Sequence, residues 1–132
     1  MSDPAAAPSA FVALGGESKL RSLVDRFYDL MDLEPSYALI RRLHPATLDD
    51  SRDKLHWFLC GWLGGPDLYV QRFGHPRLRG RHLPFSIGIA ERDQWLACMA
   101  QAMLECDVEP SLAERLVAAL FNTADFMRNR GG

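Results

Sequence analysis

Four histidines are the side chains best suited to chemistry in this sequence of 132 residues: His44, His56, His75 and His82. His82 stands in a run of basic and apolar residues, RHLPF. A neutral imidazole in an apolar slot between helices is a common axial ligand of haem iron, and nearby arginines can pair with haem propionates. A single histidine near apolar residues is nevertheless more often an ordinary packed or surface histidine. The residues alone therefore leave a haem site open as one hypothesis.

A plain metal site is a second hypothesis. His56 and Cys60 stand four residues apart, so they share one face of a helix. Two ligands are too few for such a site, and no Cys-x-x-Cys pair accompanies them. Glycine-rich phosphate loops, Gly-x-Ser-x-Gly and His-Glu-x-x-His are also absent from the sequence. A helical bundle with a structural or interaction role is therefore the alternative to a haem protein.

Apolar residues recur with α-helical spacing along almost the whole chain, and no useful length alternates with the period of a strand. The pattern predicts an all-α fold with long helices at about 17–33, 50–63, 90–105 and 111–128 and a short one at 36–43. Prolines and glycines interrupt the stretch between Pro66 and Gly88, so we expect at most short helices there. Ser111 and Glu114 form a capping-box pattern that predicts the start of the last long helix at Ser111.

The composition is that of one ordinary globular domain, with 48% hydrophobic and 24% charged residues. A net charge of −2 gives no basic surface for nucleic acid, and no apolar run approaches the roughly eighteen residues of a membrane span. The small, Pro/Ala-rich start lacks the pattern of a secretory signal, so we expect residues 1–12 to be a flexible extension and residues 13–130 to be the domain. Three cysteines, an odd number, favour a reducing, cytoplasmic setting.

An ordered series of motifs spanning Ala13 to Met127 resembles the group II truncated haemoglobins. The motifs are Arg26-Phe27-Tyr28, Gly64-Gly65-Pro66, Tyr69, Gly74-His75-Pro76-Arg77-Leu78-Arg79, Arg81-His82, Pro84-Phe85 and Glu91-Arg92-Asp93-Gln94-Trp95-Leu96-Ala97-Cys98-Met99. The resemblance implies a two-over-two helical sandwich that encloses one haem b. It also implies that the irregular stretch carries the proximal histidine.

The resemblance implies a role for each matching residue. His82 is the expected proximal ligand to the iron, and Tyr28, His44 and Trp95 are expected to face a bound gas. We expect Ser51 about where larger globins have a distal histidine and Leu55 on the distal wall. The other expected haem contacts are Lys54, Phe58, Tyr69, His75, Leu78, Arg79 and Phe85.

Some positions stay open or peripheral at this stage. Of the expected haem contacts, Lys54, Tyr69 and Arg79 are candidate propionate partners. His44 can face either the pocket or solvent at the end of its short helix. We expect His56 at the surface, because its neighbour Leu55 already faces the pocket and successive helix residues diverge.

The resemblance implies binding of O₂, CO and NO at ferrous iron. The indole N–H of Trp95 only donates hydrogen bonds, and the Tyr28 hydroxyl can donate, so we expect tight O₂ binding with slow release. Such behaviour suits a nitric oxide dioxygenase that detoxifies nitric oxide, or a protein with peroxidase-like activity. An unidentified reductase is the expected protein partner. Members of the group are often dimers, so a homodimer is compatible with the resemblance. The alternative function is a haem-free helical interaction module.

Overall fold

The computed structural model describes residues 9–131, and within them it contains helices and no strand. The helices are α1 (Ala10–Leu14), α2 (Gly16–Leu33), the 3₁₀ turn η1 (Pro35–Tyr37), α3 (Ala38–Arg41), α4 (Asp49–Trp62), α5 (Leu68–Phe73), α6 (Leu78–His82), α7 (Ile89–Glu105) and α8 (Pro110–Phe126). The all-α prediction is confirmed. The four long helices begin and end within one or two residues of the predicted bounds.

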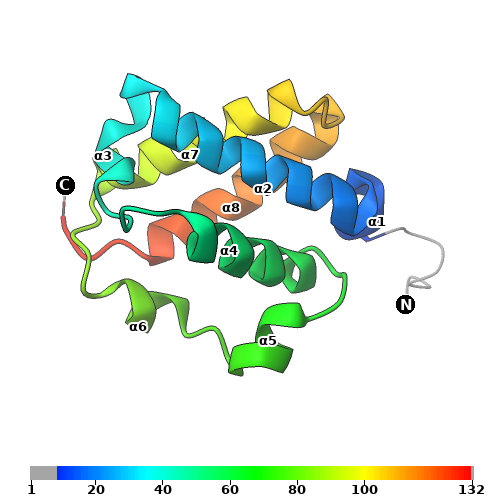
Figure 1. Ribbon diagram of the computed structural model, residues 1–132, viewed down its shortest axis with the longest axis horizontal. Helices are drawn as coiled ribbons and strands as arrows, with labels where there is room; N and C mark the ends of the chain where they lie inside the picture. The colour runs from blue at the N-terminus through cyan, green and yellow to red at the C-terminus, as the bar shows by residue number, and fades with distance from the viewer. Residues whose placement is uncertain (1–8, 132) are drawn as a thin grey trace.

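The long helices form two antiparallel pairs, and Figure 1 shows α2 with α4 and α7 with α8. The α2–α4 pair lies across the α7–α8 pair, which gives the expected sandwich of two helices over two. The short helices α5 and α6 follow α4 in the chain and lie along one side of this sandwich (Figure 1). The segment expected to carry the proximal histidine is therefore peripheral to the main core.

The core lies between the four long helices because each has one apolar stripe. On α2 the buried residues recur every three or four positions, and on α7 they do the same. The most completely buried large side chains are Phe27, Leu20, Leu23, Leu30, Met31, Met99, Val24, Cys60 and Cys98. No described helix combines the length and the apolar character that crossing a membrane requires.

The start of α8 differs from the prediction. The helix begins at Pro110, and the carboxylate of Glu109 accepts hydrogen bonds from the backbone N–H groups of Ser111 (3.1 Å) and Leu112 (2.9 Å). A proline at the first helical position already lacks the N–H that would need a partner there. The predicted cap at Ser111 is therefore wrong, because Glu109 satisfies the free N–H groups two residues earlier in the chain.

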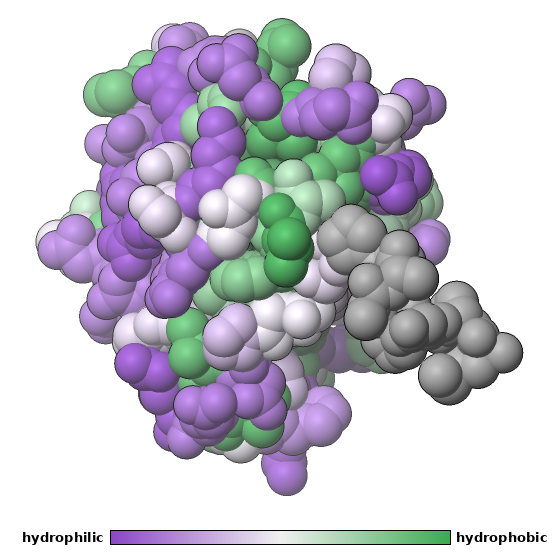
Figure 2. Space-filling model, turned by 90° about the vertical axis from the view of Figure 1, so that its right-hand side faces the viewer, coloured by the Kyte–Doolittle hydropathy of each residue, from purple (hydrophilic) through white to green (hydrophobic). Residues whose placement is uncertain are grey.

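Helix α1 crosses the expected boundary between extension and domain. The backbone N–H of Phe11 donates to the carbonyl of Leu63 (2.9 Å), and its ring packs on the core. Residues 10–12 of the expected extension are thus helical, whereas residues 1–8 lie outside the described part, so the division after residue 12 stays a prediction. Figure 2 shows the end of the molecule that carries α1, where hydrophobic side chains in the middle of the face are surrounded by hydrophilic ones.

Substitution of Gly65 tests this attachment of α1. A Cβ atom at Gly65 would lie 2.6 Å from Cγ of the Phe11 ring, closer than atoms can pack. We expect Gly65→Ala to lower the free energy of unfolding by about 1–3 kcal/mol, the usual cost of overpacking. Urea unfolding measures this change. In a Phe11→Ala background the cost of Gly65→Ala should largely disappear, and an equal cost in both backgrounds would contradict the contact.

Candidate functional site

His82 is the last residue of α6, and its ring has one nitrogen committed. Its Nδ1 lies 2.6 Å from the backbone carbonyl oxygen of Leu78. Because a carbonyl only accepts hydrogen bonds, Nδ1 carries the proton and donates, which leaves the lone pair on Nε2 free. A histidine that ligates a metal through Nε2 commonly makes such a hydrogen bond with its other nitrogen.

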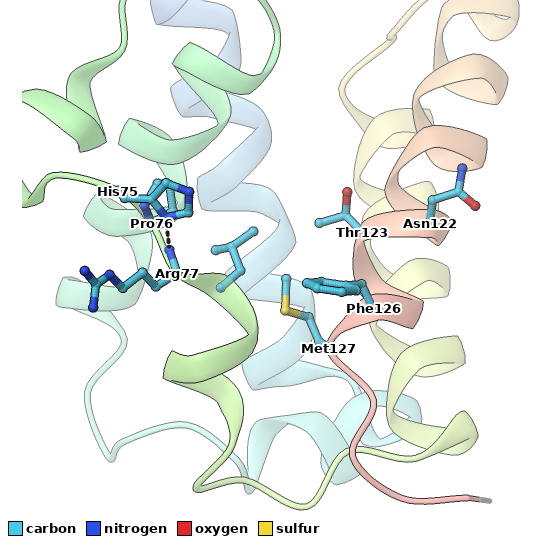
Figure 3. A pocket seen from close by; sticks show the side chains of 8 residues that line it. His75, Pro76, Arg77, Asn122, Thr123, Phe126 and Met127 are labelled. Atoms are coloured by element: carbon cyan, nitrogen blue, oxygen red, sulfur yellow. Dashed lines mark hydrogen bonds between the residues drawn. The ribbon is translucent and has the colours of Figure 1, made fainter.

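An open cavity of about 480 Å³ lies between the α6 segment and α8. The lining residues are His75, Pro76, Arg77, Leu78, Asn122, Thr123, Phe126 and Met127. Figure 3 shows the first three across the cavity from Thr123, Phe126 and Met127. The lining is mainly apolar with one arginine at its edge, a combination that suits a flat apolar ligand with acidic groups.

The aromatic rings of Tyr28, Phe27 and Trp95 form a connected group where α2 meets α7. The Tyr28 ring lies edge-on to Phe27, with centroids 4.9 Å apart, and Phe27 in turn lies 5.1 Å from Trp95. The centroids of the Tyr28 and His44 rings are 5.8 Å apart. The structure therefore brings together the three expected gas-facing residues from α2, α7 and the segment after α3.

The polar atoms of Tyr28 and Trp95 are available to a ligand. Within the described part of the chain, neither the Tyr28 hydroxyl nor the Trp95 indole N–H has a hydrogen-bond partner, and His56 Nδ1 is the one fully buried side-chain N or O left unpaired. The hydroxyl and the indole N–H therefore retain contact with accessible space. Burial raises the pKa of the Tyr28 hydroxyl far above its usual value, so this group stays a protonated donor.

His44 lies against this group of aromatic residues and is partly buried. Its Nδ1 donates to the carbonyl of Ile40 (2.8 Å). Burial lowers the pKa of His44 below its ordinary 6.5, and the charges of Arg41 and His82 lower it further.

The expected contacts on α4 and α5 lie on one side of the sandwich. Leu55 and Phe58 are partly buried against the core. The ring of Phe58 lies 6.4 Å from that of Tyr69, which is buried on α5. Ser51 is partly buried one turn before Leu55.

The remaining expected haem contacts have charged or exposed side chains, and they differ in whether hydrogen bonds already engage them. Lys54 is exposed, with its ammonium 5.9 Å above the ring of Phe73, and Phe85 is 41% exposed. The guanidinium of Arg79 donates to the carbonyls of Phe126 (2.8 Å) and Arg128 (3.0 Å), so it is engaged at the end of α8. Arg77, in contrast, lines the cavity, and its side chain makes no hydrogen bond to the described residues.

Asn129, just after α8, holds the His82 segment in place. Its side-chain amide donates to the carbonyls of His82 (3.3 Å) and Phe85 (2.6 Å), and its side-chain oxygen accepts from the N–H of Ile87 (2.9 Å). The backbone N–H groups of Asn129 and Arg130 both donate to the carbonyl of Ile87. Sequence reasoning did not single out Asn129, because its partners lie more than forty positions away.

Two other features of the site lay beyond sequence reasoning. Thr123 and Phe126 line the cavity but stand off the apolar stripe of α8, so periodicity gave no signal for them. His56, expected at the surface, is buried with 5% exposure, and that expectation is wrong. Adjacent helix residues do diverge, but helix α2 covers the side of α4 to which His56 points.

The residues present fit a haem group. Nε2 of His82 is free, and an open, mainly apolar cavity begins one turn earlier at Leu78. The Tyr28 hydroxyl and the Trp95 indole N–H lack hydrogen-bond partners among the described residues. The bacterial-like globin family model matches residues 9–129. The chain belongs to this family. The expected resemblance to globins is thus confirmed over nearly the whole length of the chain.

Individual relatives place this globin among the group II truncated haemoglobins. It is 41% identical over 115 residues to the group 2 truncated hemoglobin YjbI of Bacillus subtilis, covering 87% of this chain and 85% of that protein. The group II 2-on-2 hemoglobin of Agrobacterium tumefaciens superimposes with a TM-score of 0.89 at 43% identity, covering 98% of each chain. A truncated oxygen-avid haemoglobin from Bacillus subtilis gives a TM-score of 0.85 at 39% identity, covering 92% of this chain and 100% of that one. Membership supports haem-based binding of small gases.

The lowered pKa of His44 predicts a pH dependence of the globin's stability. As the pH falls below about 6.5, His44 is protonated in the unfolded chain but still neutral in the folded chain. The free energy of unfolding therefore decreases with falling pH until the pH passes the pKa of His44 in the folded chain. We expect His44→Phe to lose less stability than the original protein between about pH 7 and 5, measured by urea unfolding. His75→Gln, at an exposed position, is the control. Equal losses for His44→Phe and the original protein would contradict the burial of His44.

Proposed function

We propose that this globin is a haem b protein that binds O₂ and other diatomic gases, including CO and NO, with tight O₂ binding and slow release. When bound, haem supplies a ferrous iron that takes a diatomic gas. The observation that carries the proposal is the His82 ring: Nδ1 is held by the carbonyl of Leu78, a residue that lines the cavity, and Nε2 is left free.

The side chains that line the cavity would hold the group. His82 would supply the proximal ligand through Nε2, and Leu78, Phe126 and Met127 would give apolar contact. Arg77 takes the role of propionate partner in place of Arg79, because the Arg79 guanidinium is already bonded to two carbonyls. Binding of a propionate by Arg77 would break no existing side-chain hydrogen bond to the described residues.

Slow release is expected because two hydrogen-bond donors, Tyr28 and Trp95, have no partner among the described residues. Trp95 only donates, and the Tyr28 hydroxyl is kept protonated by burial. Hydrogen bonds to a ligand with negative charge are worth roughly 1.5–3 kcal/mol each, so two would slow escape on the order of a hundredfold or more. The related haemoglobin from Bacillus subtilis is described as oxygen-avid, which supports the same behaviour here.

A globin that holds O₂ tightly suits chemistry or sensing better than delivery. Oxidation of nitric oxide and reaction with peroxide are the activities that we propose. Each turnover would need an electron source, so we expect a reductase as partner. The homodimer and the cytoplasmic setting also stay predictions.

Replacement of Trp95 tests the proposed role of the donors. We expect Trp95→Phe to speed O₂ release by roughly ten- to a hundredfold, the worth of one charge-assisted hydrogen bond. CO carries less negative charge on binding, so its release should change much less. Stopped-flow ligand exchange measures both rates.

The matched control is Trp62→Phe, which alters a partly buried tryptophan outside the group of aromatic residues around Tyr28. This variant should release both gases at the original rates. Equal acceleration of O₂ and CO release by Trp95→Phe would contradict a donor role and indicate a steric one.

A further inference from the structure

A cluster of three potential metal ligands lies where α2 meets α4. Glu17 comes from the first turn of α2, and His56 and Cys60 come from successive turns of α4. A carboxylate oxygen, His56 Nε2 and Cys60 Sγ all lie within 4.8 Å of one another. In the sequence, His56 and Cys60 alone are too few ligands for a metal site. The fold adds a third, Glu17, which lies 39 positions before His56. We propose that Glu17, His56 and Cys60 bind one Zn²⁺ ion, at a site separate from the haem cavity.

The two distances from His56 Nε2 to the other ligand atoms are close to those of a tetrahedral zinc site. His56 Nε2 lies 3.3 Å from Glu17 Oε1 and 3.8 Å from Cys60 Sγ. Ordinary zinc–ligand bonds at tetrahedral angles separate N from O by roughly 3.4 Å and N from S by roughly 3.6 Å. The contact of His56 with Glu17 is, in contrast, longer than a normal N–H···O hydrogen bond. Little movement would therefore be needed to admit the ion.

Hydrogen bonding accounts for only one of the two ring nitrogens of His56, because Nε2 contacts Glu17 and Nδ1 has no partner in the described part of the chain. The His56 side chain is 6% exposed. Buried imidazoles normally have their nitrogens paired, and an apolar side chain would fill the same space at lower cost. A coordination bond from Nε2 would stabilise the ring on the side that faces Glu17 and Cys60, although it would not pair Nδ1.

The ligand types select the class of metal. Thiolate, imidazole and carboxylate together suit Zn²⁺, whereas Mg²⁺ and Ca²⁺ prefer oxygen ligands only. The Glu17 side chain is 59% exposed, so a fourth position can be taken by water from the solvent side. Such a site would join the beginning of α2 to the second half of α4, two segments that lie at the same end of the molecule in Figure 1.

The test uses the full, haem-loaded chain with its thiols reduced. The protein is dialysed against Zn²⁺, and zinc and iron are counted per chain by mass spectrometry. We expect one zinc per chain beyond the iron. Glu17→Gln, at an exposed position, should weaken zinc binding at least about tenfold, and Cys60→Ala should remove it. Cys106→Ala and Glu34→Gln are matched controls outside the cluster and should retain zinc.

Proton release gives a second readout. Burial raises the pKa of the Cys60 thiol to about 11, so the thiol is protonated at neutral pH and must lose its proton to bind zinc. Calorimetry in buffers of different ionisation enthalpy should find about one proton released per zinc bound. Absence of stoichiometric zinc in the original protein, or zinc that is retained equally by Glu17→Gln and Cys60→Ala, would overturn the proposal. Neither outcome bears on haem binding, which the iron count reports independently.

Discussion

The hydrogen bonds of Asn129 determine where His82 stands, and the site depends on them. Helix α6 has five residues and none of them is buried, so the hydrophobic core does not hold it. Its position comes instead from polar contacts: the Asn129 amide pairs with the carbonyls of His82 and Phe85 and with the N–H of Ile87. The N–H of Ile87 is part-buried, and loss of its Asn129 partner would carry the usual cost of an unpaired backbone group. The segment after α8 thus positions the turn that carries His82, the proposed iron ligand.

Packing of aromatic rings, and not hydrogen bonds to the backbone, holds the two donors Tyr28 and Trp95 in place. The rings of Phe27, Tyr28 and Trp95 pack edge to face within the main core, where α2 meets α7. Arg52 donates to the backbone carbonyl of Asp25 and to the carboxylate of Asp29, and its guanidinium lies 5.9 Å from the Tyr28 ring. These contacts tie α4 to α2. Donors set in packed aromatic rings need little reorganisation when a ligand arrives, which favours slow release.

Sequence periodicity predicted the long helices because their burial is local and repetitive, as on α2, where apolar residues recur every three or four positions. Features that depend on contacts between distant residues carried no such signal. Phe126 faces the cavity from a position off the apolar stripe of α8, and His56 is buried because α2 happens to cover it. The start of α8 was misplaced since a glutamate cap at Glu109 can replace the serine pattern at Ser111. The resemblance to a family supplied what periodicity could not, namely a prediction of which histidine would ligate the iron.

The central claim is that His82 holds haem in a site open to gas. The most direct measurement is the visible absorption spectrum of the purified protein, before and after reduction and exposure to CO, together with that of His82→Gly. We expect a strong haem band that shifts with CO in the original protein, loss of the band in the variant, and its recovery when imidazole is added. Absence of a haem band in the original protein, even after addition of haemin, would contradict the claim.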